Sequence, residues 1–169
     1  MSPSPTDVLL VGYGNPGRLD DGLGPALAEA VQGMALPGVT VEVDYQLNVE
    51  HAALAVRYRH VLFVDAAVDG PEPFTFRRLQ AAGEAAFTTH SLQPEAVLAM
   101  AGELFGARPE GFVLGIRGYD FSEFGEHLSP GALTNLAAAL RFLLPVLEGR
   151  GFRDAAEAAA AGQTLTTER

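Results

Sequence analysis

Apolar and polar positions alternate along the chain in a pattern that predicts strands and helices in turn. Short apolar runs closed by glycine or aspartate indicate buried strands, and apolar residues three and four positions apart indicate helices packed by one face. In the first part of the chain this pattern predicts a strand at 8–13, a helix at about 22–32, a half-buried strand at 39–45, a short helix at 52–57 behind Asn48, and a buried strand ending at Asp65.

The second part of the chain continues the alternation after one closely following strand. Residues 73–79 follow the previous strand too closely for a crossover helix, so we expect an antiparallel edge strand. A helix at 94–105 and a strand at 111–119 come next. A final helix begins behind Ser129, with Pro130 at its first position, and Pro145 is expected to kink or end it.

This order predicts an α/β protein with helices on both faces of a mostly parallel sheet of five strands, one of them antiparallel. We expect one α/β domain over residues 1–149. Residues 150–169 have few large apolar side chains, so they are expected to form a flexible or partly helical tail outside the core.

Composition and charge narrow the class of function. The 169 residues include no cysteine, which excludes disulfides, thiolate metal sites and a cysteine nucleophile. The net charge is −10 and the arginines are scattered, so nucleic acid is not an expected partner. No leader and no apolar run of membrane-spanning length is apparent, so we expect a cytoplasmic protein with no membrane partner. A monomer is expected, because no apolar surface helix is left unassigned.

Four polar residues follow predicted strands, at the ends where open α/β sheets bind ligands. They are Asp20 and Asp21, Asp65, and His90 in "FTTHSLQPEAV". Singly, an Asp before a helix is more often a cap, an Asp after a strand often caps a turn, and a loop His is usually not functional. Together, two carboxylates and an imidazole can hold a divalent ion or perform acid–base chemistry without one.

Other motifs carry less weight. "GYGNPG" before a helix is a weak dinucleotide-binding signal, because Arg18–Asp21 stand where a third glycine is expected and the two carboxylates would repel a pyrophosphate. No Walker pattern and no Gly-x-Ser-x-Gly elbow is present. His51, His60 and His127 have no supporting neighbours, so we treat them as structural or surface residues.

The chain resembles the hydrogenase maturation proteases, the endopeptidases that process the large subunit of nickel–iron hydrogenases. The resemblance rests on "GYGNPGRLDDGLG", a strand ending in Asp65, "THSLQPEAVLAM" and "HLSPGAL", and it covers about residues 7–148. It implies a three-layer α/β/α sandwich of the phosphorylase/hydrolase-like kind. It also implies removal of a C-terminal extension from the large-subunit precursor after nickel insertion.

The resemblance further implies that Asp21, Asp65 and His90 are the catalytic and nickel-contacting residues, with Asp20 as a neighbour that caps the helix or supports the site residues. Nickel would arrive with the substrate and bind the free enzyme weakly. Where many relatives have a small-residue loop, this chain has "DYQLNVEHAAL", in which Gln46 and Asn48 could bind a peptide backbone.

Three alternatives remain open at this point. A non-catalytic nickel-binding maturation chaperone would use the same ligands in a tighter site. "VGYGNPG" also resembles the opening of bacterial peptidyl-tRNA hydrolases, although no histidine precedes His51 here and the acidic charge disfavours a tRNA partner. A nucleotide-dependent reductase is the third.

Overall fold

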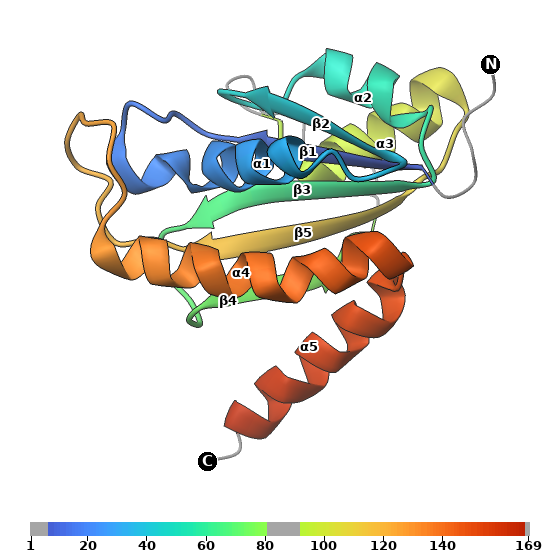
Figure 1. Ribbon diagram of the computed structural model, residues 1–169. Coiled ribbons are helices and arrows are strands. Elements are labelled where there is room, and N and C mark those ends of the chain that lie inside the picture. Colours follow the sequence, from blue (N-terminus) through green and yellow to red (C-terminus); the bar gives the residue numbers. More distant parts are fainter. Residues whose placement is uncertain (1–6, 81–91, 168–169) are drawn as a thin grey trace.

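The computed structural model describes residues 7–80 and 92–167, with side chains described up to residue 162. Its centre is a five-stranded sheet in the order β2-β1-β3-β5-β4, in which only β4 is antiparallel (Figure 1). The strands are β1 Val8–Tyr13, β2 Val39–Asp44, β3 His60–Ala67, β4 Phe74–Arg78 and β5 Glu110–Arg117. The predicted architecture, including the antiparallel edge strand, is confirmed.

Helices cover both faces of this sheet. The face formed by α1 and α4 lies opposite the face formed by α2 and α3 (Figure 1). The helices are the 3-10 helix η1 Leu19–Gly22, α1 Leu23–Met34, α2 Val49–Ala55, α3 Pro94–Phe105, α4 Pro130–Gly149 and α5 Phe152–Thr167. Asn48 caps α2 and Ser129 caps α4, as the sequence predicts.

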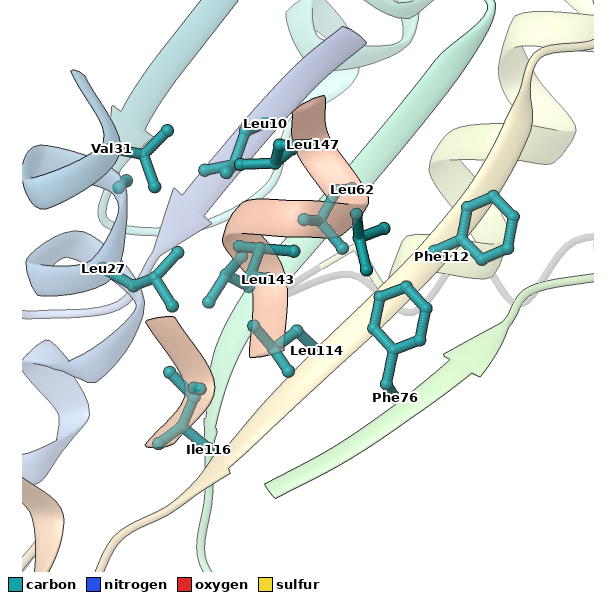
Figure 2. Packing of buried hydrophobic residues seen from close by; sticks show 14 of the residues in the cluster. Leu10, Leu27, Val31, Leu62, Phe76, Phe112, Leu114, Ile116, Leu143 and Leu147 are labelled. Atoms are coloured by element: carbon teal, nitrogen blue, oxygen red, sulfur yellow. The ribbon is translucent and has the colours of Figure 1, made fainter. Parts of the chain in front are cut away.

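Each central strand supplies side chains to both core layers, because successive residues of a strand point to opposite faces. On β1, Val8 and Leu10 face α1 and α4, whereas Leu9 and Val11 face α2 and α3. Figure 2 shows the first layer, built by residues of the sheet, α1 and α4: Leu10, Leu27, Val31, Leu62, Phe76, Phe112, Leu114, Ile116, Leu143 and Leu147. The candidate site lies beyond these two layers, at the carboxyl ends of β1 and β3.

Two expectations about the C-terminal part of the chain are wrong in part: α4 does not end before Pro145, and the tail, which is helical as expected, reaches the core. Helix α4 continues through Pro145, because Leu143, Val146 and Leu147 on either side are buried against the core. The tail is not outside the core: the side chain of Phe152 at the start of α5 is fully buried, and α5 packs against β4. The structure also extends β3 two residues beyond Asp65, to Ala67.

We expected no apolar segment of membrane-spanning length, but helix α4 has that length. Its 20 residues are long and apolar enough to cross a membrane, by length and composition only. In the structure Ala132, Ala139 and Leu143 on one face are fully buried in the core. This packing is that of an amphipathic helix covering a sheet.

Candidate functional site

The candidate site lies where the topology of the sheet reverses. From β1 the chain crosses to β2 on one side, and β3 pairs with β1 on the other side. Open α/β sheets bind ligands outside the carboxyl ends of the strands at such a point. Asp21 follows β1 and Asp65 lies near the end of β3, so both predicted carboxylates flank this position.

Glycines allow helix α1 to begin directly over β1 and β3. A Cβ atom on Gly24 would lie 2.4 Å from the carbonyl oxygen of Tyr13 and 2.5 Å from that of Val64. Gly14 has φ +140°, and a Cβ atom there would lie 2.1 Å from the Asp21 carbonyl oxygen. The glycines of the opening motif therefore permit close packing, which accounts for them without a nucleotide.

The turn between β1 and η1 is held by short hydrogen bonds. Asn15 Oδ1 accepts a hydrogen bond from the backbone amide of Gly17 at 2.9 Å. The backbone amide of Asn15 donates a hydrogen bond to Asp21 Oδ2 at 2.8 Å. Leu19 has φ +52°, an uncommon conformation for a residue with a side chain that costs about 1 kcal/mol. This left-handed residue directly precedes Asp20 and Asp21 and changes the chain direction there.

Asp20 is fully buried and binds the loop between β5 and α4. Its carboxylate accepts hydrogen bonds from Tyr119 N at 2.8 Å, Asp120 N at 3.0 Å, Ser129 N at 2.8 Å and Ser129 Oγ at 2.7 Å. Burial alone would raise the pKa of Asp20, but the hydrogen bonds from Asp120, Ser129 and Tyr119 outweigh it, so the pKa lies below its usual value. Asp20 is therefore a charged structural anchor.

Among the carboxylates that the structure describes, Asp65 has the most perturbed ionisation. Burial raises its pKa to about 6, against hydrogen bonds from the Ala66 amide and the Tyr13 hydroxyl, and the negative charge of Asp21 adds to the increase. The Ala66 amide lies 2.8 Å from Asp65 Oδ1. The charge of Asp21 therefore reaches Asp65 through space, although burial is the larger cause of the shift.

Tyr13 is a neighbour of Asp65 that the sequence analysis did not identify. Burial and the Asp65 carboxylate raise the pKa of the Tyr13 hydroxyl far above its ordinary value, so it stays a neutral donor to Asp65. The parallel register, in which Gly12 pairs with Val64, would have placed Tyr13 beside Asp65. The sequence did contain a signal for this contact: aligning the apolar run of β1 with that of β3 as parallel neighbours puts Tyr13 next to Asp65.

Polar residues also occupy the same level of the sheet on both sides of this pair. Tyr13 pairs with Asp44 of β2, and Asp65 pairs with Gly115, which in turn pairs with Thr75 of β4. Asp44 Oδ2 lies 3.7 Å from Nε2 of His51, whose Nδ1 accepts the Asn48 amide at 3.0 Å. His51 and Asn48 thus support the α2 cap, so neither Asn48 nor His51 needs a substrate to account for it.

His90, the third predicted site residue, lies outside the described residues. Among the parts of the chain that the structure describes, no three His, Asp or Glu side chains are grouped closely enough to hold a metal ion. His60 is buried at the start of β3, at the amino ends of the parallel strands and away from the candidate site, and His127 is exposed. The described part of the site is therefore a pair of carboxylates, Asp21 and Asp65, with one hydroxyl donor.

This pair has two chemical capacities. Carboxylate oxygens bind divalent ions, but two carboxylates leave most coordination positions to other ligands. A carboxyl group with a pKa near 6 can also accept or return a proton close to neutral pH. Both capacities need a second molecule at the site: one that supplies the remaining metal ligands, or one that exchanges the proton.

Comparison with solved structures finds hydrogenase maturation enzymes. HycI, a [NiFe] hydrogenase maturation protease from Thermococcus kodakarensis KOD1, matches with a TM-score of 0.66 and 22% identity, over 85% of this chain and 93% of that one. HybD, a hydrogenase maturating endopeptidase from E. coli, matches with a TM-score of 0.63 and 21% identity, over 86% and 94%. A hydrogenase 2 maturation peptidase from Thaumarchaeota archaeon SCGC_AB-539-E09 matches with a TM-score of 0.62 and 23% identity, over 83% of this chain and 97% of that one.

No protein-family model and no curated protein sequence matches the chain. The structural matches nevertheless span nearly the full length of the solved proteins, and the part of this chain that they cover is more than four fifths. The chain therefore has the fold of the hydrogenase maturation endopeptidases.

Proposed function

We propose that the protein is an endopeptidase that removes the C-terminal extension of a nickel–iron hydrogenase large subunit after nickel insertion. The observation that carries the proposal is the pair Asp21 and Asp65 at the topological switch point, with the pKa of Asp65 raised to about 6. The fold shared with solved hydrogenase maturation endopeptidases supports the same reaction.

In this proposal nickel belongs to the substrate, and Asp21, Asp65 and His90 recognise it. Two carboxylates and one imidazole are an incomplete ligand set for nickel, so the free enzyme would bind the ion weakly. A precursor that carries nickel supplies the remaining ligands, whereas an empty precursor lacks the anchor. A tenfold preference for the loaded precursor requires only about 1.4 kcal/mol.

Asp65 has the proton affinity that peptide hydrolysis requires. Water attacks the carbonyl carbon of the scissile peptide and forms a C–O bond, the C–N bond breaks, and the departing amine gains a proton. When Asp65 is not bound to the ion, its carboxylate has a pKa near 6 and can take the proton from water and return it to the amine. The Tyr13 hydroxyl, which donates to Asp65, would hold that carboxylate in place.

The test is processing of a purified large-subunit precursor, prepared with and without nickel and followed by intact mass. We expect the wild-type protein to shorten only the loaded precursor. Asp21→Asn and Asp65→Asn should stay folded and lose at least about a hundredfold in rate, whereas Asp69→Asn, an exposed Asp after β3, should keep the wild-type rate.

Three results would contradict the proposal. Equal cleavage of the empty precursor would remove the role of nickel. Full activity of Asp65→Asn would remove that residue from the chemistry. Tight stoichiometric nickel binding by the free protein, without cleavage, would indicate the nickel chaperone instead.

A further inference from the structure

The loop at residues 118–129, between β5 and α4, exposes a large apolar side chain. Phe124 is 86% exposed, more than any other exposed large hydrophobic residue in the described part of the chain, and the guanidinium of Arg18 lies 5.7 Å from its ring centroid. An isolated exposed apolar residue needs no explanation, but an exposed aromatic on a rigid support is typical of a binding hot spot.

The support of this loop is unusually complete. Asp20 accepts hydrogen bonds at both ends of the loop, from Tyr119 and Asp120 and from Ser129, and its own amide donates to the Asp120 carbonyl at 2.9 Å. The Tyr119 hydroxyl bonds Glu72 and accepts from Asn135 at 2.9 Å. A loop held in this way loses little conformational freedom when it binds a partner.

The loop adjoins the candidate site directly. The Gly125 amide donates to the Gly17 carbonyl at 2.8 Å, and the Leu19 amide donates to the Gly125 carbonyl at 2.9 Å. Gly125 follows Phe124, and Leu19 precedes Asp21 by two positions. Figure 1 shows the two loops side by side at the carboxyl edge of the sheet. A partner whose chain enters the site can therefore contact Phe124 at the same time.

The charges around Phe124 define the partner. Arg18 lies at the ring, but the loop itself carries three exposed carboxylates, Asp120, Glu123 and Glu126, and the chain has a net charge of −10. Two copies of this acidic loop would repel each other, so a second copy of the chain is disfavoured as the occupant. The complementary surface is an apolar pocket with basic residues at its rim.

We infer that the 118–129 loop docks the large-subunit precursor, with Phe124 in an apolar pocket of the precursor and the three carboxylates facing basic side chains around it. This inference rests on the proposed function and adds a second contact, away from the cleaved bond. It also gives Asp20 a task distinct from that of Asp21: Asp20 fixes the docking loop, and Asp21 faces the site.

The test measures binding of the nickel-loaded precursor to the immobilised full chain by interferometry. Phe124→Ala should weaken binding about 10- to 30-fold, whereas Phe105→Ala, a half-exposed Phe at the other end of the fold, should stay within about twofold of wild type. The double variant Glu123→Gln/Glu126→Gln should slow association several-fold at low salt and show a weaker dependence on salt. Thermal unfolding checks that each variant is folded.

Wild-type affinity of Phe124→Ala for the precursor would overturn the inference and leave the proposed function intact, provided that the wild-type protein cleaves. Dimerisation of the wild-type chain that Phe124→Ala abolishes would also overturn it, because the loop would then bind a second copy. Failure of the wild-type protein to bind and to cleave the precursor would instead refute the proposed function.

Discussion

Asp20 and Asp21 are adjacent in the sequence but lie in different surroundings. Asp20 is fully buried and accepts four hydrogen bonds from a loop about a hundred residues away, whereas Asp21 is partly exposed and accepts one from Asn15. The sequence predicted that the pair lies at a helix start and that Asp20 caps the helix or supports the site residues. The cap is wrong, because Asp20 lies inside η1 and neither η1 nor α1 has a side-chain hydrogen bond at its N-cap. The sequence could not predict the partners of Asp20, because they depend on how the β5–α4 loop returns over η1.

This difference predicts losses of stability of different size when each Asp is replaced by Asn. Asp20→Asn would turn an amide NH₂ toward groups that are themselves donors, and the free energy of unfolding should fall by about 2–4 kcal/mol. Asp21→Asn removes only one acceptor in a solvated position and should cost about 1 kcal/mol or less. Urea unfolding of the two variants measures both, and equal losses would contradict the role given to Asp20.

Helix α5 shows where residue patterns mislead at the scale of elements. Its sequence is rich in alanine, and Phe152 is the one large side chain that its described residues place in the first core layer, beside the small side chains of Ala155, Ala156 and Ala159. The ring of Phe152 stacks on His60 at 4.7 Å and on Phe112 at 5.2 Å. One large side chain in a polar segment is a weak sequence signal, although it can bury enough apolar surface to hold the helix.

His60, on which Phe152 stacks, is expected to make the stability of the protein depend on pH, because its pKa differs between the folded and unfolded states. Burial lowers the pKa of His60, and the charges of Arg59, Arg150 and Arg153 add to this, against the opposing charge of Glu110. The unfolded imidazole therefore takes up its proton first as the pH falls through about 6.5. The stabilising effect of the neutral, buried imidazole is complete above that pH and declines below it.

His60→Leu checks this prediction, since leucine can pack on Phe112 and Phe152 and does not titrate. Between pH 7.5 and 5, the free energy of unfolding of the wild-type protein should decline more than that of the variant, measured by urea unfolding at each pH. The same pH dependence in both proteins would show that His60 does not contribute. The sequence analysis treated His60 as a structural residue, and this experiment examines that role.

At the scale of the whole molecule, the fold was predictable because its signals are local. The period of the apolar residues separates strands from helices, and the short link before β4 requires an antiparallel neighbour. The path of α4 through Pro145 was not predictable, because burial of its neighbours on the sheet compensates for the lost hydrogen bond. Tertiary packing decided that element.

The candidate site was predictable only in part. The rule that ligands bind at the carboxyl ends of the strands predicted that Asp21 and Asp65 lie at the same end of the sheet, and in the structure the charge of Asp21 reaches Asp65. Tyr13 and the 118–129 loop were missed, because one requires strand register and the other requires contacts across the fold. The roles of Asp21, Asp65 and His90 toward nickel stay a prediction.

The most direct test of the proposed activity is the intact mass of the hydrogenase large subunit in cells of the source organism that lack this protein. We expect the subunit to keep its C-terminal extension and to contain nickel. A gene for the wild-type chain should restore the shorter mass, and a gene for Asp65→Asn should not. A large subunit of mature length in the deletion strain would contradict the account.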